Sequence, residues 1–268
     1  MSHEYPGPMI KVVDLVTYYG ERRILNHVSL EVQRGETMVI LGASGTGKST
    51  LIRHMIRLEK PTSGHIYIEG HDVCCMPEER FNLLRRKIGM LFQSAALFNS
   101  MTVGENVALP LRELTELEDS TIRIMSRIKL DLVGLGGFED FMPSQLSGGM
   151  KKRAGLARAL AMDPEILLFD EPSAGLDPIT AAGIDNLILK LKKAFNMTSV
   201  VVTHEMASAE LIADRVAVMD QGEVIAFGTW PEVKASRHPR VLRFLNRQPD
   251  EETKDAQEFL KELTQPSS

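Results

Sequence analysis

Short apolar runs recur along the chain, and the two clearest of them end in glycine-rich or acidic residues. Residues 38–41 read Met-Val-Ile-Leu and precede a segment with three glycines, while residues 166–169 read Ile-Leu-Leu-Phe and precede two carboxylates. Runs this short and this apolar indicate buried parallel strands, which present the residues that follow them at the carboxyl edge of a sheet. Residues 50–58 and 121–132 show instead the apolar spacing of amphipathic helices. This mixture of strands and helices predicts an α/β fold.

Residues 94–158 differ from the segments on either side because they contain few β-branched runs. Within them, residues 121–132 carry apolar side chains at helical spacing, which predicts that these side chains face a hydrophobic core. They are Ile122, Met125, Ile128 and Leu132. We therefore expect a helical subdomain of about residues 94–158, inserted into a core of about residues 9–93 and 159–228.

The segment after the first apolar run fits the P-loop pattern G-x-x-x-x-G-K-S between a predicted strand and a predicted helix. Its glycines let backbone N–H groups turn toward phosphates, Lys48 reaches the outer phosphates, and Ser49 offers a hydroxyl to Mg²⁺. The helix N-terminus behind the loop adds the positive end of its dipole. The predicted nucleotide-binding residues here are Gly42, Ala43, Ser44, Gly45, Thr46, Gly47, Lys48, Ser49 and Thr50.

Two carboxylates, Asp170 and Glu171, follow the second apolar run. In a P-loop protein, Asp170 would hold Mg²⁺, and Glu171 would orient or deprotonate the water that attacks the γ-phosphate. Taken alone, such a pair could instead be two solvated acids at the end of a strand, with no catalytic role. The P-loop upstream favours the catalytic interpretation.

Three further motifs complete a recognisable set: Leu146-Ser147-Gly148-Gly149-Met150, Ser173-Ala174-Gly175-Leu176-Asp177 and Val202-Thr203-His204. With the P-loop and the acidic pair, residues 9–228 resemble the ATPase subunits of ABC transporters. The resemblance implies an ABC nucleotide-binding domain over residues 1–245. Its fold would be a P-loop NTPase (RecA-like) core with an antiparallel β subdomain and an inserted α-helical subdomain.

The resemblance also assigns roles to three residues whose signals are weak when taken singly. Gln93 is similar to the Q-loop glutamine, which touches Mg²⁺ and the water and reports the nucleotide state to the membrane partner. His204 is similar to the switch histidine that contacts the γ-phosphate. Tyr19 fits the aromatic residue that stacks on adenine, with Tyr18 as the alternative because adjacent strand residues face opposite ways. Packing of these tyrosines on the sheet surface is the structural alternative.

Residues 146–150 are similar to the signature motif of this family, which contacts ATP held by another copy of the subunit. The resemblance therefore implies that Ser147, Gly148, Gly149 and Met150 bind the γ-phosphate in the partner's P-loop, so that ATP joins a head-to-tail homodimer. Hydrolysis would reopen this dimer, and Asp177 would report the state of one site to the other.

Charge argues against nucleic-acid partners. The formal net charge is −5, and residues 249–268 hold six acids against two lysines. The basic run of residues 151–153 is too short for a nucleic-acid footprint, and we interpret it as a solvated helix face. Cys74 and Cys75 lack the spacing of redox or zinc sites, so we expect incidental thiols and no metal other than Mg²⁺.

No run approaches the roughly 18 apolar residues that a membrane helix needs, and the first residues lack the apolar core of a signal peptide. We expect a cytoplasmic protein, peripheral on the cytoplasmic face of the inner membrane. Residues 246–268 form an acidic tail whose apolar residues, with those of 241–245, predict two short amphipathic helices. These would dock on this subunit or on its second copy, and a disordered end is the alternative.

The cargo must be inferred from subfamily features. The fifth signature residue is Met150, where importers of sugars or amino acids usually carry Gln. In this departure and in residues 92–98, 102–113 and 171–180, the chain resembles the ATPases of MCE-type lipid transporters. That resemblance implies phospholipid transport with an integral-membrane permease, an MCE protein and often a STAS-domain protein.

Residues 96–101 would offer a groove to a permease helix, or else pack as subdomain core. Two alternatives for the whole chain remain. The nearer is the ATPase of another ABC transporter, for amino acids, metals or lipoproteins. The remote one is an ABC ATPase that acts on nucleic acid, although the chain has no coiled-coil insertion, zinc module or second cassette.

Overall fold

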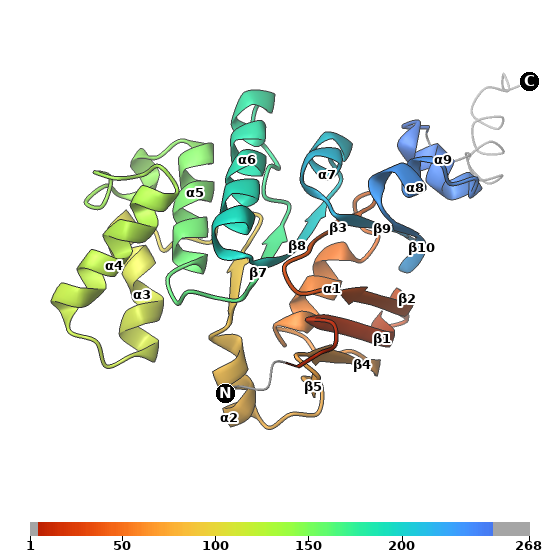
Figure 1. Ribbon diagram of the computed structural model, residues 1–268, viewed down its shortest axis with the longest axis horizontal. Helices are drawn as coiled ribbons and strands as arrows, with labels where there is room; N and C mark the ends of the chain where they lie inside the picture. The colour runs from red at the N-terminus through yellow and green to blue at the C-terminus, as the bar shows by residue number, and fades with distance from the viewer. Residues whose placement is uncertain (1–4, 249–268) are drawn as a thin grey trace, which may run out of the picture.

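A six-stranded, mainly parallel sheet forms the centre of the computed structural model, which describes residues 5–248 (Figure 1). Its strand order is β10-β9-β3-β8-β7-β6, and only β10 runs antiparallel to its neighbour. The two apolar runs of the sequence are β3 and β7, and every residue of both strands is buried. The strands are β3 (Thr37–Leu41), β6 (Ile88–Leu91), β7 (Ile166–Asp170), β8 (Thr198–Thr203), β9 (Arg215–Asp220) and β10 (Glu223–Gly228).

A second sheet, antiparallel and four-stranded, has the order β2-β1-β4-β5. Helix α1 (Lys48–Met55) packs between the two sheets, because its Leu51, Ile52 and Met55 share one hydrophobic cluster with residues of β1 and β3. The helix is buried on more sides than an amphipathic pattern predicts. Even His54 is buried, with its ring nitrogens 2.8 Å from Thr17 Oγ1 and 3.0 Å from a backbone carbonyl. The strands are β1 (Ile10–Tyr19), β2 (Arg22–Val32), β4 (Ser63–Ile68) and β5 (His71–Asp72).

Helices α3, α4 and α5 form a lobe at one end of the molecule (Figure 1). This lobe shares its core with the parallel sheet, since Val103 and Leu130 belong to the same hydrophobic cluster as Phe169 of β7. No helix within residues 5–248 is both long and apolar enough to cross a membrane. The helices are α2 (Glu78–Arg85), α3 (Val103–Leu114), α4 (Asp119–Leu132), η1 (Pro143–Gln145), α5 (Gly148–Ala159), α6 (Pro178–Phe195), α7 (Met206–Ile212), α8 (Trp230–Lys234) and α9 (Pro239–Leu245).

One core prediction for α4 is wrong. Ile122 is buried as expected, but Ile128 is 52% exposed. The buried stripe of the helix runs through Ile122, Ser126 and Leu130, which lie four residues apart on one face. At about 100° per residue, Ile128 lies some 240° round the helix from Ile122, outside that stripe.

The predicted amphipathic helix at residues 241–245 is α9, in which Val241 is fully buried and Phe244 and Leu245 pack against the main core. The end of the chain therefore docks on this subunit at least as far as Leu245. The second helix predicted for the acidic tail, and most of the tail of residues 246–268, lie outside the described residues.

Candidate functional site

The register of the parallel strands brings most of the predicted site residues to one edge of the sheet. Leu41 at the end of β3 pairs with Thr203 at the end of β8, and Asp170 at the end of β7 pairs with Val202. Leu91 at the end of β6 pairs with Phe169. The P-loop, the two carboxylates, His204 and Gln93 therefore all follow strands that end at the same edge, where open α/β sheets bind ligands.

The P-loop wraps around its own lysine. Lys48 Nζ donates hydrogen bonds to the carbonyl oxygens of Gly42 (2.8 Å) and Ala43 (2.9 Å), and it lies 3.8 Å from Glu171 Oε1. Burial lowers the pKa of Lys48, although the nearby Glu171 and Asp170 carboxylates act in the opposite direction. Gly47 has a φ of 97°, and a Cβ atom there would lie 2.8 Å from the carbonyl oxygen of Ile24. Only glycine fits this turn into α1.

A pocket of about 240 Å³ opens beside the P-loop and contains Tyr19 but not Tyr18 in its lining. The Tyr19 hydroxyl donates a hydrogen bond to Glu59, and the residue as a whole is 47% exposed. Tyr19 is therefore the tyrosine placed beside the phosphate loop. Arg22 and Ile24 of β2 line the same pocket, and no motif in the sequence points to them. The remaining lining residues are Gly45, Gly47, Lys48, Ser49 and Thr50.

Ser49 and Asp170 meet at the bottom of the site. Ser49 Oγ donates a hydrogen bond of 2.7 Å to Asp170 Oδ1, and Asp170 is almost fully buried. A hydroxyl and a carboxylate oxygen side by side are hard ligands of the kind that Mg²⁺ prefers. These two residues have the oxygen atoms that a magnesium ion would require here.

Glu171 has the conformation of a constrained functional residue. Its φ is 48°, in the left-handed region that non-glycine residues seldom adopt, and its backbone N–H donates to the Val202 carbonyl. Its Oε2 lies 2.9 Å from His204 Nδ1, and its other carboxylate oxygen faces Lys48. The other ring nitrogen of His204, Nε2, lies 3.3 Å from Glu205. Glu171, His204 and Lys48 thus form one connected group.

Gln93 lies in an exposed turn after β6, and within residues 5–248 its side chain makes no hydrogen bond to Ser49 or Asp170. Its backbone carbonyl accepts a hydrogen bond from Lys152 Nζ, which also donates to the Glu171 carbonyl at 3.0 Å. Arg158, one helical turn and a half further along α5, donates to the carbonyls of Ala95 and Ala96. Helix α5 therefore fastens the loop that carries Gln93.

The prediction of a solvated face for residues 151–153 is wrong for Lys152, which is only 5% exposed. Burial lowers its pKa, while the Asp170 and Glu171 carboxylates act in the opposite direction. A buried ammonium requires acceptors, and the two backbone carbonyls supply them. Sequence reasoning missed Lys152 because those acceptors come from segments distant along the chain.

The signature and Asp177 form a second group. Ser147 caps α5 by accepting a hydrogen bond from the Met150 N–H at 3.3 Å, and Asp177 caps α6 by accepting from Ile179 and Thr180. The two helix ends touch, since a Cβ atom on Gly149 would lie 2.4 Å from Thr180 Cγ2. Hydrogen bonds, first among them one from the Thr180 side chain, lower the pKa of Asp177.

The second group does not complete the first within one copy of the chain. Ser147 and Gly148 are exposed, and no described residue of the signature lines the pocket beside the P-loop. Met150 packs against the main core. The chain therefore carries a phosphate loop with its acids in one place, and a separate helix start that is exposed at Ser147 and Gly148.

Comparison with known proteins identifies the family. A family model described as ABC transporter matches residues 25–174. The chain is 40% identical to the intermembrane phospholipid transport system ATP-binding protein MlaF of Haemophilus influenzae, over 95% of this chain and 98% of that protein. It is 42% identical to the probable ribonucleotide transport ATP-binding protein mkl of Mycobacterium leprae, over 90% of this chain and 69% of that protein.

Among solved structures, the chain resembles the dimeric ATP-binding cassette MJ0796 in a post-hydrolysis state bound to ADP and Pi. The TM-score is 0.76 at 34% identity, over 82% of this chain and 98% of that one. The family model spans more than half of this chain, and the match to MlaF runs almost end to end. The chain belongs to the ABC transporter family, and it is an ATP-binding and ATP-hydrolysing cassette of that family.

Proposed function

We propose that this chain is the ATPase subunit of a transporter that moves phospholipids between two membranes. The observation that supports phospholipid as the cargo is the match to MlaF over 98% of that protein's length. The mkl protein, named for ribonucleotide transport, matches over a smaller share of its own length. Met150 in the signature supports the lipid assignment, because it departs from the Gln typical of sugar and amino-acid importers.

The two separate groups of site residues support a composite site between two copies. Tyr19, the P-loop, Asp170, Glu171 and His204 would bind and hydrolyse ATP in one copy. Ser147, Gly148, Gly149 and Met150 of the other copy would contact its γ-phosphate, where the start of α5 adds free N–H groups and a positive dipole end. Asp177, beside the signature, would pass the state of one site to the other. The MJ0796 cassette is itself described as dimeric.

The contacts of Glu171 suggest how hydrolysis proceeds. Its carboxylate would accept a proton from the attacking water, while His204 holds the carboxylate and contacts the γ-phosphate. Lys48, already beside Glu171, would stabilise charge on the outer phosphates. Ser49 and Asp170 would hold Mg²⁺, which neutralises phosphate charge when bound. Gln93 would join this metal and the water from its exposed turn.

The lobe of α3, α4 and α5 would transmit the nucleotide state of the site to the permease in the membrane. We propose that it is the helical subdomain of about residues 94–158, and that the permease contacts it near Phe98, which is 50% exposed. Leu97 packs against the core instead, so this segment is partly core and partly surface. Because Lys152 ties the Gln93 turn to α5, a change at the nucleotide would move the turn and the signature together.

The permease would hold the chain at the cytoplasmic face of the inner membrane. The other partners in this proposal are a second copy of the chain, an MCE protein and a STAS-domain protein.

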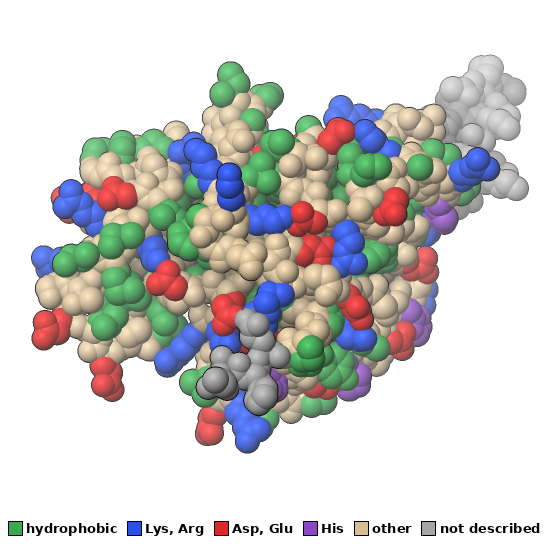
Figure 2. Space-filling view, viewed as in Figure 1, with side chains coloured by type: hydrophobic (Ala, Val, Ile, Leu, Met, Phe, Trp, Pro, Cys, Tyr) green, Lys and Arg blue, Asp and Glu red, His purple; other side chains and the backbone are tan. Residues whose placement is uncertain are grey.

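On the face shown in Figure 2, acidic and basic side chains are interspersed, which is not the basic footprint of a nucleic-acid-binding surface. This distribution agrees with a membrane-transport role.

Affinity purification of the chain from detergent-solubilised membranes, followed by mass spectrometry, tests the cargo. We expect a permease and an MCE protein to elute with it. A permease of another class would contradict the lipid assignment and leave the ATPase intact. Recovery of soluble or nucleic-acid partners alone would contradict the transporter role.

Replacing Glu171 with Gln should lower the ATP hydrolysis rate by about 10²- to 10⁴-fold, the range expected when a general base is removed. ATP would still bind, so closed dimers should accumulate in size-exclusion chromatography with ATP. Glu205→Gln is the matched control, because Glu205 contacts the opposite nitrogen of His204. Its rate should stay close to that of the unmodified chain. If both variants hydrolysed ATP at the rate of the unmodified chain, Glu171 would not be the base.

Replacing Lys152 with Ala should lower kcat by about tenfold to a hundredfold, because it frees both the Gln93 turn and the backbone of Glu171. KM for ATP should change little, since Lys152 does not line the nucleotide pocket. Lys151→Ala, at the more exposed neighbouring position, serves as the control in steady-state assays. A thermal melt confirms folding, and an unchanged kcat in a folded Lys152→Ala protein would rule out the positioning role.

A further inference from the structure

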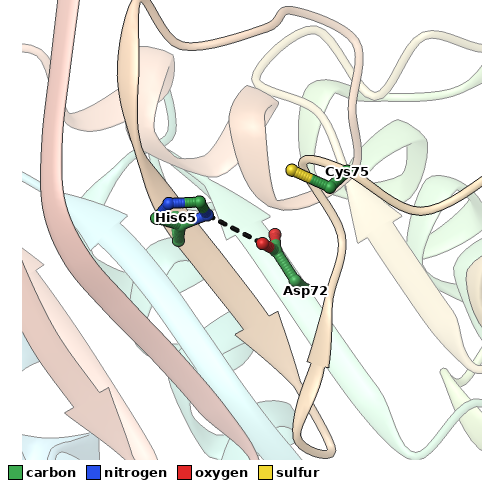
Figure 3. A group of neighbouring side chains, drawn as sticks. All are labelled: His65, Asp72 and Cys75. Carbon is green, nitrogen blue, oxygen red and sulfur yellow. Dashed lines mark hydrogen bonds and ion pairs between the residues drawn. The ribbon is translucent and has the colours of Figure 1, made fainter.

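Three side chains with metal-binding atoms lie together on the antiparallel sheet, apart from the nucleotide pocket (Figure 3). His65 is on β4, Asp72 is on β5, and Cys75 follows in the loop that leads to α2. Strands β4 and β5 form a tight hairpin in which Tyr67 pairs with Asp72. His65 lies two residues before Tyr67, so its side chain is on the same face of the hairpin as Asp72.

One ligand atom from each residue lies within 4.8 Å of the other two. The closest pair is His65 Nδ1 and Asp72 Oδ2, at 2.7 Å. The second oxygen of Asp72 accepts a hydrogen bond of 2.9 Å from the Cys74 N–H. This bond fixes the carboxylate against the loop that carries Cys75, as an outer partner orients a metal ligand.

We propose that His65, Asp72 and Cys75 bind a zinc ion, with a water molecule as the fourth ligand. Imidazole, carboxylate and thiolate are the ligands that zinc takes in tetrahedral sites. Mg²⁺ is excluded as the occupant because it prefers oxygen ligands and octahedral geometry. The site is therefore chemically distinct from the oxygen ligands of Ser49 and Asp170.

The fit requires only a small contraction. Bonds of about 2.0–2.3 Å in a tetrahedron place neighbouring ligand atoms roughly 3.3–3.8 Å apart. The thiol must therefore approach by about 1 Å, while the hydrogen-bonded His65 and Asp72 side chains separate slightly. His65 and Cys75 are exposed, so their side chains have room to adjust. The metal would tie the two-residue strand β5 and its loop to β4.

Access to the site is open. Asp72 and Cys75 line a surface pocket of about 480 Å³, which also includes His71 and Arg80. An ion can reach Asp72 and Cys75 through this pocket, and His65 is itself exposed to solvent. The positive side chain of Lys87 at the same pocket is already paired with Glu69 and Glu165.

The adjacent cysteine provides an internal control. Cys74 packs against the hydrophobic cluster between the sheets. Cys75 is exposed and faces His65 and Asp72 (Figure 3). Because the Cys74 side chain packs against that cluster, only Cys75 of the two adjacent thiols can serve the site. The spacing of the cysteines did not reveal the site, because its ligands lie on β4, on β5 and in the following loop and do not form a C-x-x-C motif.

Titration of the reduced, full-length protein with Co²⁺ tests the proposal, with Zn²⁺ added afterwards as a competitor. We expect a thiolate-to-cobalt charge-transfer band in the near ultraviolet at one equivalent, and we expect zinc to displace it. Cys75→Ser should remove the band, and His65→Ala should weaken zinc binding by more than about tenfold. Cys74→Ser should retain the band. Co²⁺ at Ser49 and Asp170 would have no sulfur ligand and would not give this band.

Thermal melting without and with Zn²⁺ separates loss of the site from loss of the fold. Cys75→Ser and His65→Ala should melt near the unmodified protein without metal and should lose its zinc-induced rise in Tm. Absence of the band in the unmodified protein would overturn the proposal. So would a band that survives Cys75→Ser, or one that Cys74→Ser removes.

Discussion

The parallel register of β3, β8, β7 and β6 is the constraint on which the rest of the site depends. Because Leu41 pairs with Thr203, and Asp170 with Val202, the strand ends form one edge. Strands β3, β7 and β8 are short and buried along their whole length, so a slip in register would displace a buried set of side chains as well as the polar residue that follows it. The packing of the core thus fixes where the phosphate loop, the carboxylates and His204 lie relative to one another.

Helix α5 connects this edge to the exposed signature. Ser147 and Gly148 at its start face solvent, and one turn later Lys152 reaches into the protein to two backbone carbonyls. A buried ammonium that lost those acceptors would be left unpaired at a substantial free-energy cost. Lys152 therefore holds α5, the Gln93 turn and Glu171 in one arrangement. In the proposed dimer, a shift of any one of them would also displace the signature that contacts ATP in the other copy.

Much of the fold and of the site was predictable from local sequence. The strands β3 and β7, the P-loop and the acidic pair follow from short patterns whose chemistry is contained in a few consecutive residues. Ile128, Lys152 and the group of His65, Asp72 and Cys75 could not be placed in this way. Their environments are created by the folded structure: a helix face that turns away from the core, two carbonyls from other segments, and a hairpin that sets Asp72 and Cys75 beside His65.

ATP-dependent dimerisation of Ser147→Arg in a Glu171→Gln background tests the composite site most directly. ATP binding and oligomeric state would be measured together, by nucleotide titration and by light scattering after size-exclusion chromatography. We expect ATP to bind with nearly unchanged affinity, since Ser147 does not line its own copy's pocket. The protein should remain monomeric, because the arginine side chain occupies the place of the partner's γ-phosphate. Stable dimers of this double variant with ATP would contradict a site shared between two copies.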